Sequence, residues 1–253
     1  MRAQDYADLY ALEESLWWFV GMREVTRALL DPFCAPGPRR DILDAGCGTG
    51  GMLTWLERYA GGGRVAGVDI STDALEFCRG RGLQDVTQAS VTSLPFADGT
   101  FDLVTSFDVL VQLPGEGSDE EAMREMFRVL RPGGFAFVRA AAYEWMRSGH
   151  DEALDTRRRY TLARLVERMA RAGLRVRRAT YANGLLLPAA VIRRLVLKRL
   201  GLADPGSDVR PPGPDLLNRA LATALKAEAK LLARSNVNLP AGLSVICVAE
   251  RPR

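Results

Sequence analysis

A glycine-rich turn between a predicted strand and a predicted helix constrains the fold of this chain more than any other feature. The run LDAGCGTGG at 43–51 follows a short apolar stretch and opens a segment with helical periodicity. Glycine has no Cβ, so Gly46, Gly48 and Gly50 allow a sharp turn and a close approach of backbone to ligand. Folds that bind dinucleotides use the same device for a pyrophosphate, so the turn alone leaves the ligand open.

Two acidic residues distinguish between the possible ligands. Asp44 lies inside the turn, where a carboxylate would repel a pyrophosphate but attract the ammonium of a methionine moiety. Asp69 ends a second predicted strand about twenty residues later, where an acid can bind the hydroxyls of a ribose. Asp69 also suits the start of a helix, as an alternative. The pattern favours S-adenosylmethionine as the cofactor.

The chain resembles the class I S-adenosylmethionine-dependent methyltransferases, and is most similar to the type 11-like branch that acts on small molecules and lipids. The resemblance rests on five landmarks in the family's order: the glycine-rich turn, the acid after the second strand, and the runs SLPF at 93–96, FDLV at 101–104 and LRPGG at 130–134. They cover residues 42–138, a little over a third of the chain.

This resemblance implies a set of cofactor-binding residues. They are Asp44, Gly46, Cys47, Gly48, Gly50, Asp69, Ile70, Ser90, Val91 and Phe107. The chain departs from the family at Ser90, where relatives usually carry an acid that meets the adenine amino group. A serine hydroxyl can still form a hydrogen bond with adenine.

Strand-like and helix-like segments alternate from residue 41 onward, which predicts an α/β fold: a Rossmann-like, seven-stranded, mostly parallel sheet with helices on both faces. Strands are expected near 41–46, 64–69, 86–90, 101–107, 134–141, 175–182 and 243–250, and helices near 49–60, 71–80, 119–130, 161–173 and 215–234. The resemblance implies that the last strand is an antiparallel edge strand. We expect a single methyltransferase domain over 1–253, with its cofactor-binding half at 36–142.

Three segments outside this core are expected to determine the substrate. We expect residues 1–35 to form a helical cap over the ligand edge. Residues 143–160 and 184–214 are expected to be insertions on the substrate side. Trp17 and Trp18 in the cap are candidates for substrate binding, or for packing in the core. Residues 185–200 mix apolar and basic side chains, which suits a helix that rests on a membrane or lipid, or an ordinary lid helix.

Candidate catalytic residues follow from where ligands bind to parallel sheets. The cofactor carries the activation for methyl transfer, so the protein must orient the nucleophile and often accept its proton. The carboxyl ends of the strands select Asp108 after the fourth strand, and Tyr143 and His150 after the fifth. His150 is the only histidine, and its ordinary pKa of about 6.5 suits a general base. A structural role is the alternative.

Arg159 and Tyr160 are candidates for substrate binding, because a guanidinium fork and a hydroxyl can hold an acidic group. An ion pair and a helix-start contact would explain them equally well. The resemblance also places a histidine, in many relatives, where this chain has Gln112. If that histidine is the usual base, this chain lacks it.

The amino-acid composition limits the classes of binding partner that we expect for this protein. The formal net charge of +3 is too small to indicate a nucleic-acid partner. Arginines cluster at 157–178, which suits solvated helix faces or, equally, an anionic substrate or membrane surface. The four cysteines lack metal-ligand spacing, so no metal site is predicted. We see no signal peptide and no apolar run long enough to span a bilayer, and expect a cytoplasmic protein.

The sequence therefore predicts an enzyme that transfers a methyl group from S-adenosylmethionine to an oxygen, before nitrogen or carbon, of a small-molecule, sugar or lipid-like acceptor. Bacterial specialised metabolism is the expected setting, and a monomer or homodimer the expected state. Two alternatives remain open. One is a methyltransferase fold with a non-methylating, cyclase-like activity, and the other is a degenerate binding module.

Overall fold

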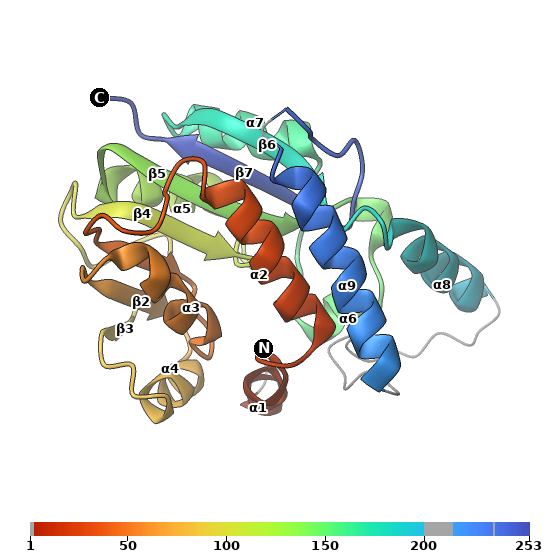
Figure 1. Ribbon diagram of the computed structural model, residues 1–253. Helices are drawn as coiled ribbons and strands as arrows, with labels where there is room; N and C mark the ends of the chain where they lie inside the picture. The colour runs from red at the N-terminus through yellow and green to blue at the C-terminus, as the bar shows by residue number, and fades with distance from the viewer. Residues whose placement is uncertain (1–2, 200–214, 235) are drawn as a thin grey trace.

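The computed structural model describes residues 3–199, 215–234 and 236–253 (Figure 1). Its centre is a seven-stranded sheet in the order β3-β2-β1-β4-β5-β7-β6. The strands are β1 (Ile42–Ala45), β2 (Val65–Asp69), β3 (Val86–Gln88), β4 (Phe101–Phe107), β5 (Leu130–Ala141), β6 (Arg175–Ala182) and β7 (Ser244–Glu250). Strands β1 to β5 pair in parallel, and β7 runs antiparallel to both of its neighbours. The predicted Rossmann-like, mostly parallel architecture is confirmed.

The position of the last strand corrects one expectation. Strand β7 is antiparallel as predicted, but it lies between β5 and β6 and is not an edge strand. Its first six residues are all buried, as in a strand covered on both faces. Strand β6 forms the edge, and its first three residues alternate between exposed and partly buried.

Helices cover both faces of the sheet. One face packs against α2 (Trp17–Leu30), α3 (Gly51–Ala60) and α9 (Asp215–Leu232), and the other against α5 (Ser118–Val129) and α7 (Leu162–Arg171). Figure 1 shows α2 and α9 side by side in front of the sheet. A Cβ at Gly21 of α2 would lie 2.4 Å from the Cβ of Leu225, so glycine permits this close approach.

Hydroxyl side chains start two of the helices. Ser71 accepts a hydrogen bond from the backbone N–H of Ala74 at the start of α4 (Thr72–Gly80), and Thr161 accepts one from Arg164 at the start of α7. Such N-caps satisfy donors that a helix leaves unpaired. These caps lie where the sequence pattern predicts helix starts. The helices predicted near 49–60, 71–80, 119–130, 161–173 and 215–234 agree with the structure within two residues at each end, whereas β5 starts at Leu130, four residues before its predicted start.

Segment 1–35 forms two helices with different positions. Helix α1 (Ala3–Leu12) lies at the carboxyl edge of the strands, whereas most of α2 packs along the face of the sheet. Met22, Val25 and Leu29 of α2 are buried there. The expected cap over the ligand edge therefore consists only of α1 and the start of α2, because the apolar stripe of α2 belongs to the core.

Three further elements lie near the same edge. They are η1 (Glu144–Met146), α6 (Gly149–Ala153) and α8 (Leu187–Arg199). Within the described ranges, no helix is both long and apolar enough to cross a membrane.

Candidate functional site

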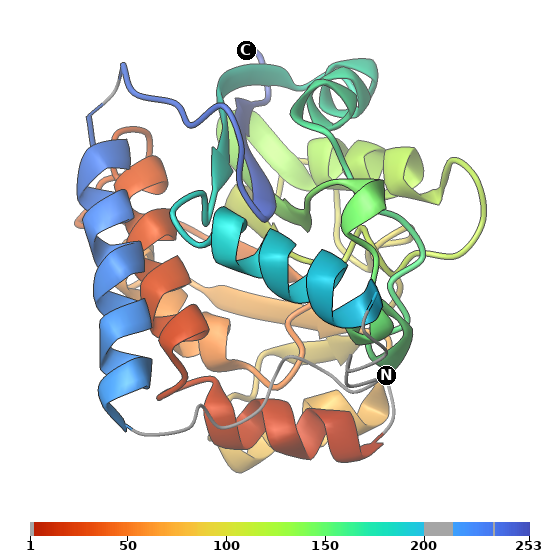
Figure 2. The same ribbon diagram turned by 90° about the vertical axis from the view of Figure 1, so that its right-hand side faces the viewer.

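A cavity of about 990 Å³ opens at the carboxyl edge of the sheet. Its walls come from α1, the start of α2, α8, the start of α9 and the segments that follow β1 to β6. Figure 2 looks at this edge, with α8 crossing the middle of the view and α1 below it. Parallel α/β sheets bind ligands at this edge, and the cavity has the size of a large ligand site, in the range of roughly 300–1,000 Å³.

The glycine-rich turn lines one end of the cavity. Gly46 and Gly50 have φ of +89° and +87°, values that favour glycine. A Cβ at Gly46 would lie 2.2 Å from Cγ2 of Val109, in the loop after β4. The N–H groups of Gly46 and Cys47 both donate to the carbonyl of Val68. The turn is thus fixed between β2 and the β4 loop.

Asp44 is the buried anion of this end. Its side chain is 1% exposed, and Thr105 Oγ1 donates to its Oδ1 at 2.7 Å. Burial raises the pKa of Asp44 to about 7, although the nearby Arg139 charge opposes the shift. A carboxylate in this position favours a cationic ligand group that would compensate its charge.

Asp69 connects the second strand to the turn. Its Oδ2 accepts the Gly48 N–H and its Oδ1 accepts the Ser71 N–H, both at 2.9 Å. Burial raises the pKa of this carboxyl. Ile70, the next residue, is 71% exposed and lies in the cavity wall, where an apolar side chain can cover the flat face of a ligand ring.

The other predicted cofactor residues lie along the same wall. Ser90 Oγ lies 2.7 Å from Thr92 Oγ1 and accepts the Thr92 N–H, which fixes the turn after β3. Val91 and Phe107 line the cavity beside it. All the predicted cofactor residues line the cavity except Gly50, which shapes the turn from behind.

Sequence reasoning missed Glu13, which ties α1 to the turn. Glu13 is 6% exposed, accepts a hydrogen bond from Thr49 Oγ1 at 2.7 Å and forms an ion pair with Arg81. Arg81 Nε also donates to the Thr49 carbonyl at 3.0 Å, and its guanidinium lies 4.2 Å from the ring centroid of Tyr10. These contacts join residues 36 and 68 positions apart, so no local pattern could reveal them.

An apolar chamber continues from the cofactor end. Trp17, Trp18 and Phe19 line it from the start of α2. Residues of α8, α9 and the segments before them complete the wall, namely Leu186, Ala189, Ala190, Leu217 and Leu221. The predicted substrate candidates Trp17 and Trp18 therefore lie at the cavity, and the described start of α8 lies over it.

A buried cation separates the two ends of the cavity, and sequence reasoning missed it. Arg139 of β5 is 5% exposed and pairs with Asp108, with Nε at 2.8 Å and Nη2 at 2.7 Å from Oδ2. Its guanidinium carbon lies 4.6 Å from the ring centroid of Trp18 and 5.0 Å from that of Phe107. An arginine inside the apolar run FAFVRAAA at 135–142 was the available signal. Asp108, predicted to be catalytic, lines the cavity within this pair.

Two predicted tyrosines do not line the cavity, which corrects the sequence analysis. Tyr160 is completely buried and donates to Asp119 Oδ2 at 2.8 Å, because the bridge between Ala142 and Tyr160 directs its ring towards α5 and α7. Tyr143 stacks on Trp145 and Tyr181, and burial with its Tyr181 contact raises its pKa to about 12.

The structure places Arg159 at the cavity, whereas it does not describe the side chain of His150. Arg159 lines the cavity, but its Nε and Nη2 bind the two carboxylate oxygens of Asp151 at 2.7 and 3.1 Å. Its Nη1 donates to the Ala142 carbonyl at 2.8 Å. Residue 150 belongs to α6, and the His150 side chain lies outside the described part of the structure.

The arginine cluster is largely engaged in internal contacts. Arg158 pairs with Asp119 at 3.1 Å, and Arg168 pairs with Glu120 at 2.7 Å. Arg178 donates to the carbonyls of Leu232 and Val237. The described residues include no group of three or more His, Cys, Asp or Glu that could hold a metal ion.

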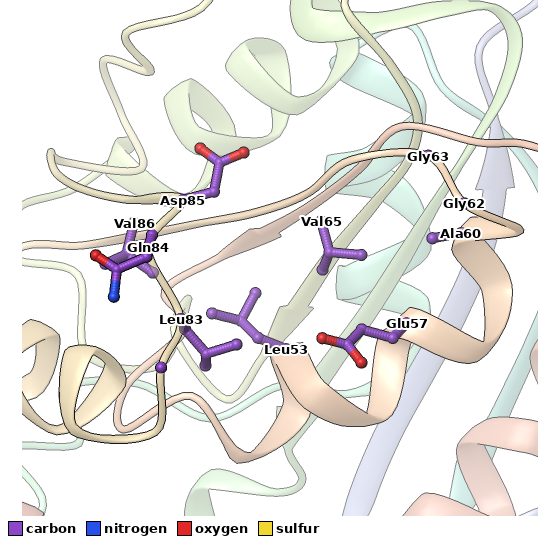
Figure 3. A pocket seen from close by; sticks show the side chains of 11 residues that line it. Leu53, Glu57, Ala60, Gly62, Gly63, Val65, Leu83, Gln84, Asp85 and Val86 are labelled. Carbon is purple, nitrogen blue, oxygen red and sulfur yellow. The ribbon is translucent and has the colours of Figure 1, made fainter.

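A second hollow of about 490 Å³ lies near the amino ends of β2 and β3 (Figure 3). Leu53, Val65 and Leu83 line it, and Asp85 at its rim pairs with Arg64. It lies away from the glycine-rich turn and from Asp44. The candidate functional site is therefore the larger cavity.

Comparison with known proteins agrees with this geometry. Residues 43–138 match the family model described as a methyltransferase domain. The chain carries a class I S-adenosylmethionine-dependent methyltransferase domain. S-adenosylmethionine is the cofactor of this family.

Two curated relatives and one solved structure illustrate the similarity of the methyltransferase domain. The methyltransferase GfsG of Streptomyces halstedii is 39% identical over 100 residues, which cover 37% of this chain and 34% of that protein. A fatty-acid O-methyltransferase of Mycolicibacterium smegmatis is 34% identical over 122 residues, which cover 45% of this chain and 43% of that protein. The [4+2]-cyclase SpnF has a TM-score of 0.55 at 23% identity, covering 90% of this chain and 81% of its own.

The matched regions set the limits of the comparison. The chain spans less than two thirds of the length of the curated relatives it matches, and the likeness to SpnF concerns the fold. The activity, acceptor and partners of this protein are therefore argued from its own cavity.

Proposed function

We propose that this protein transfers a methyl group from S-adenosylmethionine to an oxygen of a small-molecule, sugar or lipid-like acceptor. One observation carries the proposal: a single cavity joins the Asp44 and Asp69 end to an apolar chamber, with the Arg139–Asp108 pair between them. An arrangement with two ligand ends in one cavity suits a two-substrate transfer, because the reacting atoms must be held together.

The cofactor end supplies complementary groups for each part of S-adenosylmethionine. Asp44 would accept the ammonium group of the methionine moiety, and Asp69 retains lone pairs for ribose hydroxyls beyond its two backbone partners. Ser90 and Val91 would lie beside the adenine. Bound there, the cofactor supplies an activated methyl group on a sulfonium.

Arg139 supports oxygen as the accepting atom. An oxygen nucleophile develops negative charge as its proton leaves, and a fixed guanidinium stabilises that charge. An amine becomes more positive on methylation, which the same guanidinium disfavours. Asp108 keeps Arg139 in place through two hydrogen bonds, and Trp18 covers its other side. In this proposal Arg139 and Asp108 orient the acceptor, and Trp18 binds it.

The described part of the segment predicted at 184–214, which ends at residue 199, is assigned the lid role in place of a membrane contact, and residues 200–214 lie outside the described structure. Leu186, Ala189 and Ala190 line the cavity from this segment. Leu185 and Ile192 are exposed and do not belong to the cavity lining.

The test is a transfer assay with methyl-labelled S-adenosylmethionine and matched acceptors that differ in one atom, an alcohol against the amine of the same skeleton. We expect S-adenosylhomocysteine to form with the alcohol, and the alcohol to gain the mass of one methyl group. Arg139→Met should reduce this transfer while cofactor binding persists.

Two results would overturn the proposal in different ways. An acceptor that changes structure without gaining a methyl group would support the cyclase-like alternative. A protein that binds neither form of the cofactor would support the degenerate binding module.

A further inference from the structure

The far wall of the acceptor chamber contains a buried amide with an unused oxygen. Asn183 follows β6, is 2% exposed and lines the cavity. Its Oδ1 is buried and has no hydrogen-bond partner. Buried polar atoms in folded proteins are nearly always paired, so an orphan in a ligand cavity indicates a partner that arrives with the ligand.

The backbone holds Asn183 in a fixed, uncommon conformation. Its φ is +59°, a left-handed value that asparagine tolerates better than most residues. Glu228 of α9, itself 1% exposed, accepts the N–H groups of Asn183, Gly184 and Leu185 at 2.5, 2.8 and 3.1 Å. The turn before α8 is thus locked, and the amide is presented without further ordering.

The order of the strands gives the distance between this amide and the cofactor end. Phe107 of β4 pairs with Arg139 of β5, Arg139 pairs with Ile246 of β7, and Ile246 pairs with Thr180 of β6. Thr180 therefore lies three strand spacings from Phe107, or about 14 Å at roughly 4.8 Å per spacing, and Asn183 follows it three residues later, beyond the end of β6. A molecule that reacts beside Phe107 and also reaches Asn183 must be elongated.

Apolar side chains predominate in the chamber wall from α2, α8, α9 and the start of β7, which also includes Arg23, Arg193 and Ser244. Trp17, Leu186, Leu217 and Leu221 are the large apolar side chains of this wall. A mainly apolar cavity orients a ligand by its few polar groups, and Asn183 Oδ1 is a buried acceptor among them that has no protein partner. The amide oxygen accepts hydrogen bonds, so the far end of the ligand must donate one.

We propose that Asn183 is the distal anchor of the acceptor, and that the acceptor is an elongated, mainly apolar molecule with a hydroxyl or other hydrogen-bond donor at the end remote from its methyl-accepting atom. This inference rests on the proposed function, because it assigns the chamber to the acceptor. Asn183 is a specificity-determining residue here, remote from the reacting atoms.

Two straight-chain alcohols of equal length test the anchor. Dodecanediol carries a hydroxyl at both ends, whereas dodecanol carries one. Calorimetric titration into protein saturated with S-adenosylhomocysteine measures the affinity for each. We expect dodecanediol to bind roughly tenfold more tightly, the value of one net hydrogen bond. Hexanediol and hexanol, which are too short to reach Asn183, should bind with equal affinity.

Variants connect the preference to one residue. Asn183→Gly removes the amide and suits the left-handed backbone, so the turn should be retained. This variant should lose the preference for dodecanediol. Asn236→Gly changes an exposed asparagine and should keep the preference. An equal affinity of the original protein for the two long alcohols, binding of neither, or a preference that survives in Asn183→Gly would overturn the proposal.

The same experiment separates this inference from the proposed function. If the preference depends on Asn183 but no S-adenosylhomocysteine forms from the cofactor and dodecanediol or other alcohols, the anchor stands and the transfer proposal fails. If alcohols are methylated without any Asn183-dependent preference, the transfer proposal stands and the anchor fails.

Discussion

Replacing Asp44 with asparagine separates the stability of the cofactor site from its function. Asp44 is 1% exposed, and burial raises its pKa from 3.8 to about 7. The folded-state pKa lies above the unfolded one, so Asp44 stabilises the fold fully below the unfolded pKa and loses this contribution as pH rises to the folded pKa. About three pKa units at about 1.36 kcal/mol each make this loss roughly 4 kcal/mol in total.

Asparagine keeps the size of the side chain and the Oδ1 that accepts from Thr105, but it does not titrate. Without cofactor, the free energy of unfolding of Asp44→Asn relative to the original protein should therefore rise by roughly 3 kcal/mol between about pH 5 and about pH 8. Urea unfolding at the two pH values measures this. Glu76→Gln, on the exposed side of α4, is the matched control and should show no such rise.

Adding the cofactor should reverse this difference in the free energy of unfolding between Asp44→Asn and the original protein. S-adenosylmethionine should stabilise the original protein above pH 7 and leave Asp44→Asn unchanged, because only the carboxylate compensates the ammonium. A difference between variant and original protein that stays constant with pH would refute the electrostatic account of Asp44.

Three further variants test other parts of the site. Gly46→Ala should lower the free energy of unfolding by about 2–4 kcal/mol, because Gly46 has a φ of +89° and a Cβ there would lie 2.2 Å from Val109. Adding Val109→Ala should recover only the part that is due to the steric clash. Full recovery in thermal melts would contradict a cost from the left-handed backbone. Glu13→Gln should weaken the docking of α1 on the glycine-rich turn by about 1–2 kcal/mol and S-adenosylmethionine binding by up to about tenfold. An unchanged Kd for S-adenosylmethionine in calorimetry would contradict a role of the Glu13 contacts with Thr49 and Arg81 in cofactor binding. Glu228→Ala should cost about 2–4 kcal/mol in urea unfolding, because three backbone N–H groups lose their acceptor, and a loss below about 1 kcal/mol would show that the turn is held by other contacts.

Local patterns predict much of the fold. Glycine spacing, caps such as Ser71 and Thr161, and apolar runs define the strands and helices within a few residues. The place of β7 could not be predicted in this way, because strand order depends on pairing across the sheet. The apolar run VICVA at 245–249 is typical of a strand covered on both faces, but it does not identify the neighbouring strands.

The candidate site likewise contains residues that the sequence predicts and residues that it does not. Asp44 and Asp69 lie at strand ends that the sequence marks, and both line the cavity. Glu13 and Asn183 depend on contacts between distant segments, which no local pattern encodes, whereas the local signal for Arg139 was an arginine inside an apolar strand. Tyr160 was misplaced because one bridge to Ala142 turns its side chain to the other face.

Calorimetric titration of the protein with S-adenosylmethionine and, separately, with S-adenosylhomocysteine tests the central claim most directly. We predict binding in the micromolar range, about −8 kcal/mol, for the original protein, and loss of S-adenosylmethionine binding in Asp44→Ala. Absence of heat and of thermal stabilisation with either ligand would contradict the assignment of the cavity to this cofactor.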